Sequence, residues 1–197
     1  MKFLIALLVP ALLVISVCLV RSWQAGDQSR IPAEEYAVYA AMIGDMFADR
    51  VKILVIEDRT VSRIGEATEW KRYEERRLKV GFSPIISQET IDDYVAKNAK
   101  SHQLTTSLDL KLKYTLIPKE RIKQIFKELP SDEFKGQFPN SGGYIALSRA
   151  GFNTSGDQAL VYIEHICGGL CGSGHYRLLV KKNEEWVVLK KVNAWIA

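Results

Sequence analysis

Residues 144–197 determine the fold class, because their hydrophobic pattern is that of consecutive strands. Four stretches have the length and the β-branched and aromatic content of strands: "YIALSRAGF", "ALVYIEHIC", "HYRLLVKK" and "EWVVLKKVNAWIA". The segments between them, "NTSGDQ", "GGLCGSG" and "NE", are short and rich in turn residues. Strands that follow one another through such turns predict a four-stranded antiparallel meander.

The preceding part of the chain is predicted to be mainly helical. Apolar residues recur at helical spacing in "IPAEEYAVYAAMIGDMF", "SQETIDDYVAKNAKSHQL" and "PKERIKQIFKELP". Pro32 and Pro118 stand where the first turn of a helix accepts proline, and Ser87 is a suitable N-cap. The intervening stretches "VKILVIED" and "LDLKLKYTLI" are predicted strands.

Helices followed by a meander are typical of the α+β class. We therefore expect helices packed on one face of a curved antiparallel sheet that ends in the four-stranded meander. The charged stretch "EATEWKRYEERRLKV" fits an exposed helix and a charged edge strand equally well, so the sequence assigns residues 60–84 to neither.

The first 25 residues are predicted to direct export. Residues 3–20 are apolar and uncharged, and Lys2 precedes them. Their length lies between that of a signal-peptide core and that of a membrane span, so a cleaved signal peptide and an uncleaved membrane anchor both fit. In either case residues 26–197 are expected to form one extracytoplasmic domain, periplasmic or anchored in the cytoplasmic membrane through residues 3–20.

The charge balance argues against a nucleic-acid partner. The 27 Lys and Arg residues and 23 Asp and Glu residues give a net charge of +4, and the charges are spread along the chain. A nucleic-acid-binding domain normally concentrates basic residues on one face.

The segment "HICGGLCGSGH", residues 165–175, is the stretch whose residue types are best suited to metal binding, redox chemistry or catalysis. A phosphate-binding loop is excluded because a strand, not a helix, follows the glycines. A redox centre is disfavoured because three residues, rather than two, separate the cysteines, and because no neighbouring helix would stabilise a thiolate. His165, Cys167, Cys171 and His175 together would suit zinc, although a single hairpin rarely places four ligands tetrahedrally. We expect instead a disulfide between Cys167 and Cys171, in keeping with export to an oxidising compartment.

The second half of the chain resembles an uncharacterised family of exported bacterial proteins. The resemblance rests on "SRAGFN", a Ser-Arg-x-Gly-Phe-Asn turn, on "CGGLCG", a Cys-Gly-x-Leu-Cys-Gly loop, and on the closing tryptophan-containing strand. The earlier segment "TIDDYVAKN" also matches. The resemblance implies an exported location and carries no activity.

Candidate binding residues are four aromatic side chains of the predicted sheet, Tyr144, Tyr162, Tyr176 and Trp195. If the sheet is concave, they could line its open face and bind a protein or small ligand; otherwise they pack in the core.

No catalytic residue and no cofactor is predicted. Ser148, Asp157 and His165 supply the residue types of a hydrolase triad, but the sequence lacks a G-x-S-x-G elbow. We expect a non-enzymatic domain that binds a protein or small ligand. The alternative is a small extracytoplasmic hydrolase or metal-dependent enzyme that uses the His/Cys hairpin.

Overall fold

The computed structural model describes residues 30–62, 64, 68–105, 108–128, 134, 136–168 and 171–197. The predicted export segment, residues 1–25, lies outside this part of the chain, so the signal peptide and the membrane anchor stay predictions. Among the described residues, no helix combines the length and the apolar character that a membrane span requires.

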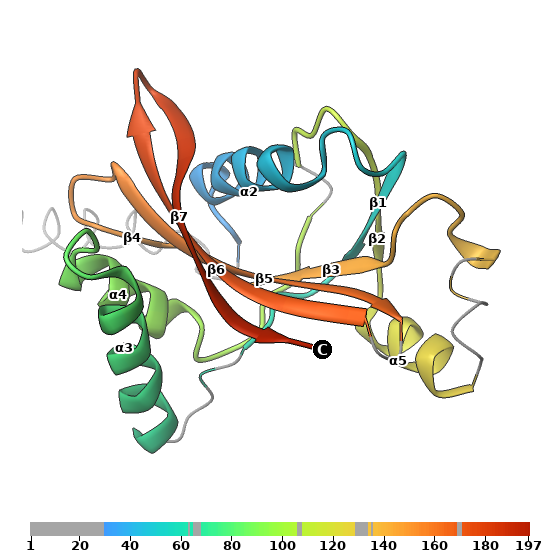
Figure 1. Cartoon of the computed structure of the whole chain (residues 1–197), viewed down its shortest axis with the longest axis horizontal. Coiled ribbons are helices and arrows are strands. Elements are labelled where there is room, and N and C mark those ends of the chain that lie inside the picture. The colour runs from blue at the N-terminus through green and yellow to red at the C-terminus, as the bar shows by residue number, and fades with distance from the viewer. Residues whose placement is uncertain are drawn as a thin grey trace, which may run out of the picture. The chain divides into compact units, whose positions relative to one another are not determined.

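The secondary structure follows the predicted order of helices and strands, and Figure 1 labels its elements. The elements are α2 (Ala33–Phe47), β1 (Ile53–Glu57), α3 (Thr68–Phe82), α4 (Gln88–Lys97), β2 (Lys113–Ile117), α5 (Lys119–Glu128), β3 (Tyr144–Leu147), β4 (Gly151–Phe152), β5 (Gln158–Gly168), β6 (Cys171–Lys182) and β7 (Glu185–Ile196). The segment that the sequence left unassigned contains α3, whose Leu78 and Phe82 are buried. Ser87 caps α4 as predicted and accepts a hydrogen bond from the Thr90 amide at 3.1 Å.

The strands form one seven-stranded mixed sheet in the order β2-β1-β3-β5-β6-β7, and β4 also pairs with β5. Strand β1 runs parallel to both β2 and β3, whereas β3–β5, β5–β6 and β6–β7 are antiparallel pairs. The α+β class is confirmed. The expectation of a purely antiparallel sheet is wrong, because helices connect β1 to β2 and β2 to β3 and allow these strands to run in the same direction.

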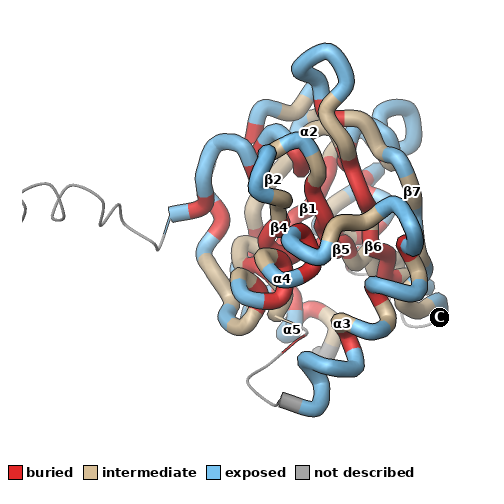
Figure 2. The backbone as a smooth tube through the Cα atoms, turned by 90° about the vertical axis from the view of Figure 1, so that its left-hand side faces the viewer, coloured by how far each residue is buried: buried red, intermediate tan, exposed pale blue. Residues whose placement is uncertain are grey.

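The expectation that the helices cover one face of the sheet is also wrong. Alternate residues of β5 belong to two different cores: Val161 and Ile163 pack in the cluster that contains α2, and Leu160 and Tyr162 pack in the cluster that contains α3 and α4. Both faces of this strand are apolar, so both must be covered. Figure 2 shows buried segments of the sheet between α2 on one side and α3, α4 and α5 on the other.

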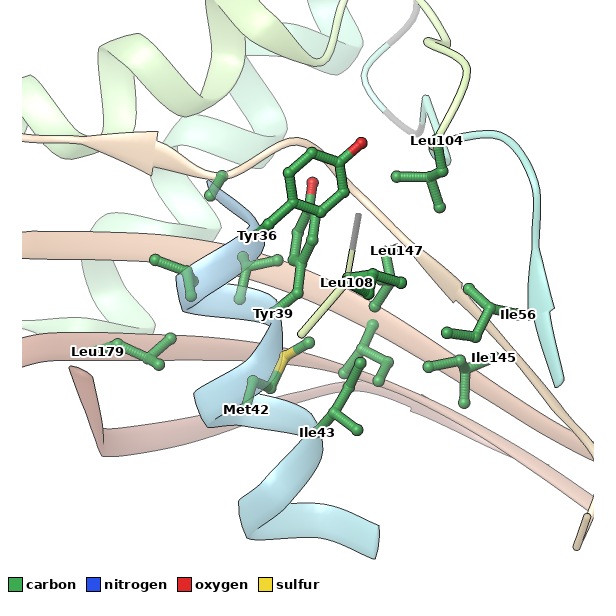
Figure 3. Packing of buried hydrophobic residues seen from close by; sticks show 14 of the residues in the cluster. Tyr36, Tyr39, Met42, Ile43, Ile56, Leu104, Leu108, Ile145, Leu147 and Leu179 are labelled. Carbon is green, nitrogen blue, oxygen red and sulfur yellow. The ribbon is translucent and has the colours of Figure 1, made fainter. Parts of the chain in front are cut away.

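Helix α2 packs through the stripe that its sequence predicted. Tyr36, Tyr39, Ile43 and Phe47 are all buried, and Met42 is buried in the same cluster. Figure 3 shows the labelled side chains of α2 directed toward residues of the strands and of the connecting loops. The apolar stripe therefore fixes which face of α2 lies on the sheet.

A buried ion pair joins α2 to the segment between β3 and β4. Glu35 is completely buried, and its Oε2 accepts hydrogen bonds from Arg149 Nε at 2.8 Å and from the Ala150 amide at 3.0 Å. A second guanidinium nitrogen, Arg149 Nη2, donates to Oε1 of the same carboxylate. Such a fork-shaped contact fixes both orientation and distance.

Two further buried side chains hold the same segment. Asn98 donates to the Arg149 carbonyl at 3.0 Å and accepts from the Arg149 amide at 2.8 Å, while the Tyr39 hydroxyl donates to the Ser148 carbonyl at 2.8 Å. These bonds satisfy backbone N–H and C=O groups that would pair with a neighbouring strand if the strand were continuous. The predicted strand "YIALSRAGF" is consequently divided into β3 and β4, and its Ser-Arg motif has a structural role.

Replacement of Glu35 by glutamine is expected to lower the free energy of unfolding by about 3–5 kcal/mol, because it leaves the buried Arg149 guanidinium without a counter-charge. Urea unfolding measures the change. The matched control is Glu120→Gln, which removes a first-turn glutamate whose side chain is 80% exposed and paired only with Lys123 in the described interactions. That control should change stability by less than about 1 kcal/mol. Equal effects of the two substitutions would contradict the role given to Glu35.

Candidate functional site: a cationic cavity at the end of helix α2

The predicted disulfide is present at the tip of the β5–β6 hairpin. Cys167 and Cys171 are bonded, and their Cα atoms lie 5.1 Å apart. With this bond formed, neither sulfur is available as a thiolate ligand, so the alternative zinc site would require the disulfide to be reduced. The histidines of that set are also engaged: His165 Nε2 contacts the Gly142 carbonyl oxygen at 2.9 Å, and both ring nitrogens of His175 contact polar side chains. No group of three metal-ligating side chains occurs among the described residues.

The four aromatic candidates are placed in two different environments. Tyr162 and Tyr176 are fully buried, and their ring centroids lie 4.9 Å apart in the core under α3 and α4. The Trp195 indole joins them by donating to the Tyr162 hydroxyl at 2.7 Å. Tyr144 packs separately, beside the cluster that contains α5. Of the four, Tyr144 and Trp195 retain exposed surface that a ligand could contact.

The residues of the considered hydrolase triad are occupied in separate interactions. Ser148 Oγ donates to the Arg149 carbonyl and accepts from the Tyr162 amide, whereas Asp157 accepts from the Asn153 side chain. The structure shows no hydrogen bond among Ser148, Asp157 and His165 in the described network.

A cavity of about 550 Å³ lies on the α2 side of the sheet, between the C-terminal end of that helix and strands β5, β6 and β7. Side chains alternate between the two faces of a strand, and this alternation places the polar residues that line the cavity on the α2 face of the sheet. Ser173, His175 and Arg177 share a face of β6 with Leu179, which packs in the α2 cluster. His165 lies directly opposite Ser173 on β5, and Lys191 lies opposite Arg177 on β7.

Positive charge dominates the lining of this cavity. Arg50, Arg177 and Lys191 contribute cationic groups, and Asp45 is the one carboxylate among the described lining residues. Arg177 Nη1 donates to Asp45 Oδ2 at 3.0 Å, but the buried Nε of the same guanidinium has no hydrogen-bond partner among the described residues. Burial lowers the pKa of Arg177; Asp45 opposes that shift, and the charge of Arg50 reinforces it.

His175 lines the cavity, and each of its ring nitrogens contacts a polar side chain. Its Nδ1 lies 3.0 Å from Asn193 Oδ1, and its Nε2 lies 2.9 Å from Ser173 Oγ. Burial lowers the pKa of His175 from its usual value of 6.5, Asn193 opposes the shift, and the nearby charges of Lys191 and Arg177 add to it. The imidazole is therefore neutral at neutral pH, with one nitrogen available as a base.

Sequence reasoning singled out two histidines of this cavity, His165 and His175, but considered them together only as ligands of the alternative zinc site. It missed Arg50, Arg177 and Lys191 altogether, because an isolated basic residue in a strand or loop looks like an ordinary solvated side chain. Only the pairing of β6 with β7 and the docking of α2 bring these residues to one place.

Comparisons of the chain with protein-family models, with curated proteins and with solved structures found no match. The resemblance to an exported bacterial family therefore stays a prediction.

Replacement of both Cys167 and Cys171 by serine is expected to lower the free energy of unfolding by about 2 kcal/mol, since the closed loop is short. Urea unfolding with and without a reductant measures this. Reductant should destabilise the unmodified chain by the same amount and leave the double variant unchanged. Alkylation of both thiols without prior reduction in the folded protein would contradict the disulfide.

Stability is expected to decrease as the pH falls below about 6.5. Burial lowers the pKa values of His175 and His102 in the folded protein, so the unfolded chain takes up these protons first. The free energy of unfolding, measured in urea between about pH 7.5 and about pH 5, should therefore depend less on pH in the His175→Gln variant. The His102→Gln variant should lose a separate part of the pH dependence of the free energy of unfolding. An unaltered pH profile in His175→Gln would contradict the inferred environment of this ring.

Proposed function

We propose that this chain is an exported domain that binds a small anionic ligand in the cavity at the end of α2. The observation that carries the proposal is the set of three cationic side chains, Arg50, Arg177 and Lys191, around a cavity to which the described residues contribute one carboxylate. Clustered cations repel one another, and a bound anion would relieve that repulsion.

The unpartnered Arg177 Nε supports the same proposal. A buried N–H group without an acceptor destabilises the protein by about 1–3 kcal/mol, and a ligand oxygen would supply the missing bond. Guanidinium groups bind carboxylates and phosphates with paired hydrogen bonds, so either group could be the anionic part of the ligand. The volume of about 550 Å³ suits a metabolite-sized molecule and is too small for a folded partner.

Export is part of the proposal. Persistent disulfides are rare in the cytosol, so the bond between Cys167 and Cys171 favours a periplasmic domain or one anchored in the cytoplasmic membrane through residues 3–20. In this proposal β3, β5, β6 and β7 act as the four-stranded meander of a curved sheet, and the cavity lies on its α2 face. The resemblance to exported bacterial proteins is consistent with this location.

Binding of inorganic phosphate and of succinate, measured separately by calorimetry at low ionic strength, tests the proposal and separates the two classes of anion. At least one should bind saturably and more weakly as salt is added. Arg177→Gln should weaken that binding about 10- to 100-fold, the effect of losing a charge-assisted hydrogen bond. The control, Arg76→Gln, removes an exposed arginine of α3 on the opposite side of the sheet. Absence of saturable binding, or an equal loss in the control, would refute the proposal.

A further inference from the structure

Ser173, His175 and Asn193 form a continuous hydrogen-bonded chain, and Ser173 and His175 also line the cavity. His175 Nε2 lies 2.9 Å from Ser173 Oγ, and His175 Nδ1 lies 3.0 Å from Asn193 Oδ1. Ser173 and His175 are two residues apart on β6, and Asn193 is paired with His175 on β7. The sheet itself holds the three side chains in place, so the arrangement does not depend on a loop.

The asparagine determines which nitrogen of the imidazole carries the proton. An amide oxygen can only accept, so the contact with Asn193 Oδ1 requires a proton on His175 Nδ1. The lone pair of Nε2 then faces Ser173 Oγ and can accept the hydroxyl proton. This is the order of groups that activates a serine nucleophile: a hydroxyl, a neutral base, and a third group that orients the base.

The surroundings favour chemistry at this serine. His175 is only 8% exposed, which keeps the imidazole neutral and limits competition from water. The same cavity contains Arg177 and Lys191, whose positive charges would stabilise an oxyanion formed from a carbonyl group.

We propose that Ser173 is a nucleophile that hydrolyses small esters carrying an anionic group. This inference rests on the proposed function, because the anionic group of the ester would bind to the cationic lining of the cavity. It places the hydrolase alternative on Ser173, His175 and Asn193 instead of on a metal or a cysteine.

The reaction needs no reagent other than water. Ser173 Oγ forms a bond to the ester carbonyl carbon while its proton passes to His175 Nε2, and Asn193 accepts the hydrogen bond of the imidazolium. The bond between the carbonyl carbon and the alkoxy oxygen breaks, and the alcohol leaves with the proton from Nε2. A water molecule then gives a proton to Nε2 and its oxygen to the acyl carbon, the bond to Oγ breaks, and Oγ recovers the proton as the acid departs.

The test uses the full chain with two chromogenic esters, mono-4-nitrophenyl succinate, which is anionic, and 4-nitrophenyl butyrate, which is neutral. After the rate without protein is subtracted for each ester, nitrophenolate should be released faster from the anionic ester. Ser173→Ala and His175→Gln should each reduce the rate by about 100-fold or more. The matched control is Ser155→Ala, an exposed serine of the β4–β5 loop, which should leave the rate unchanged.

Mass spectrometry of the unmodified chain treated with phenylmethylsulfonyl fluoride gives a readout that does not depend on the folding of a variant. One sulfonyl group should be found on the peptide that contains Ser173. Saturable anion binding without ester hydrolysis or Ser173 labelling would overturn the nucleophile and leave the proposed function intact. Hydrolysis that persists in Ser173→Ala would overturn it equally. Absence of anion binding together with Ser173 labelling would instead refute the binding proposal and the preference for anionic esters, and would leave only the nucleophilic role of Ser173.

Discussion

The structure depends on how helix α2 is fixed to the sheet, and the ion pair between Glu35 and Arg149 is the central contact. A fully buried carboxylate destabilises a protein unless it is paired with a positive charge and hydrogen-bonded. Here the Arg149 guanidinium supplies the charge, and both the guanidinium and the Ala150 amide donate hydrogen bonds to Glu35. The apolar stripe of α2 determines which face packs, while the ion pair determines where along the sheet the helix lies. At the opposite end of the helix, Asp45 pairs with Arg177. Helix α2 is thus attached through charged groups near both of its ends.

The cavity is a consequence of this attachment. Because α2 is positioned from its first turn, its last turn lies over the part of β5, β6 and β7 where polar residues replace the apolar core. Arg177 belongs both to the attachment and to the cavity: one nitrogen binds Asp45, and the buried Nε has no partner among the described residues. Because the fold provides a hydrogen-bond partner for one nitrogen of this guanidinium but not for Nε, a ligand could complete the hydrogen bonding of Arg177.

Sequence reasoning found the elements and the disulfide, but it found neither the arrangement of the helices nor the site. The strands were recognisable from β-branched runs, and Ser87 from its position before α4. Sequence reasoning did not predict that helices cover both faces of the sheet. The segment "ALVYI" in β5 is nevertheless apolar at every position, which is the pattern of a strand buried on both sides. Parallel pairing of β1 with β2 and β3 has no local signal, because it depends on contacts between residues far apart in the chain. For the same reason Arg50 and Lys191 could not be linked to His175, and zinc binding, the alternative to the disulfide, was the one role considered for the two histidines together.

An NMR titration of the chain with a small anion tests most directly whether the cavity at the end of α2 binds anions. The titration follows the Nε–H resonance of Arg177 and the ring resonances of His175. Both sets of resonances should shift together and saturate at the same anion concentration, because a bound anion completes the hydrogen bonding of Arg177 beside the imidazole. Resonances of Arg177 that stay unmoved while exposed arginines of α3 shift without saturation would contradict anion binding in this cavity.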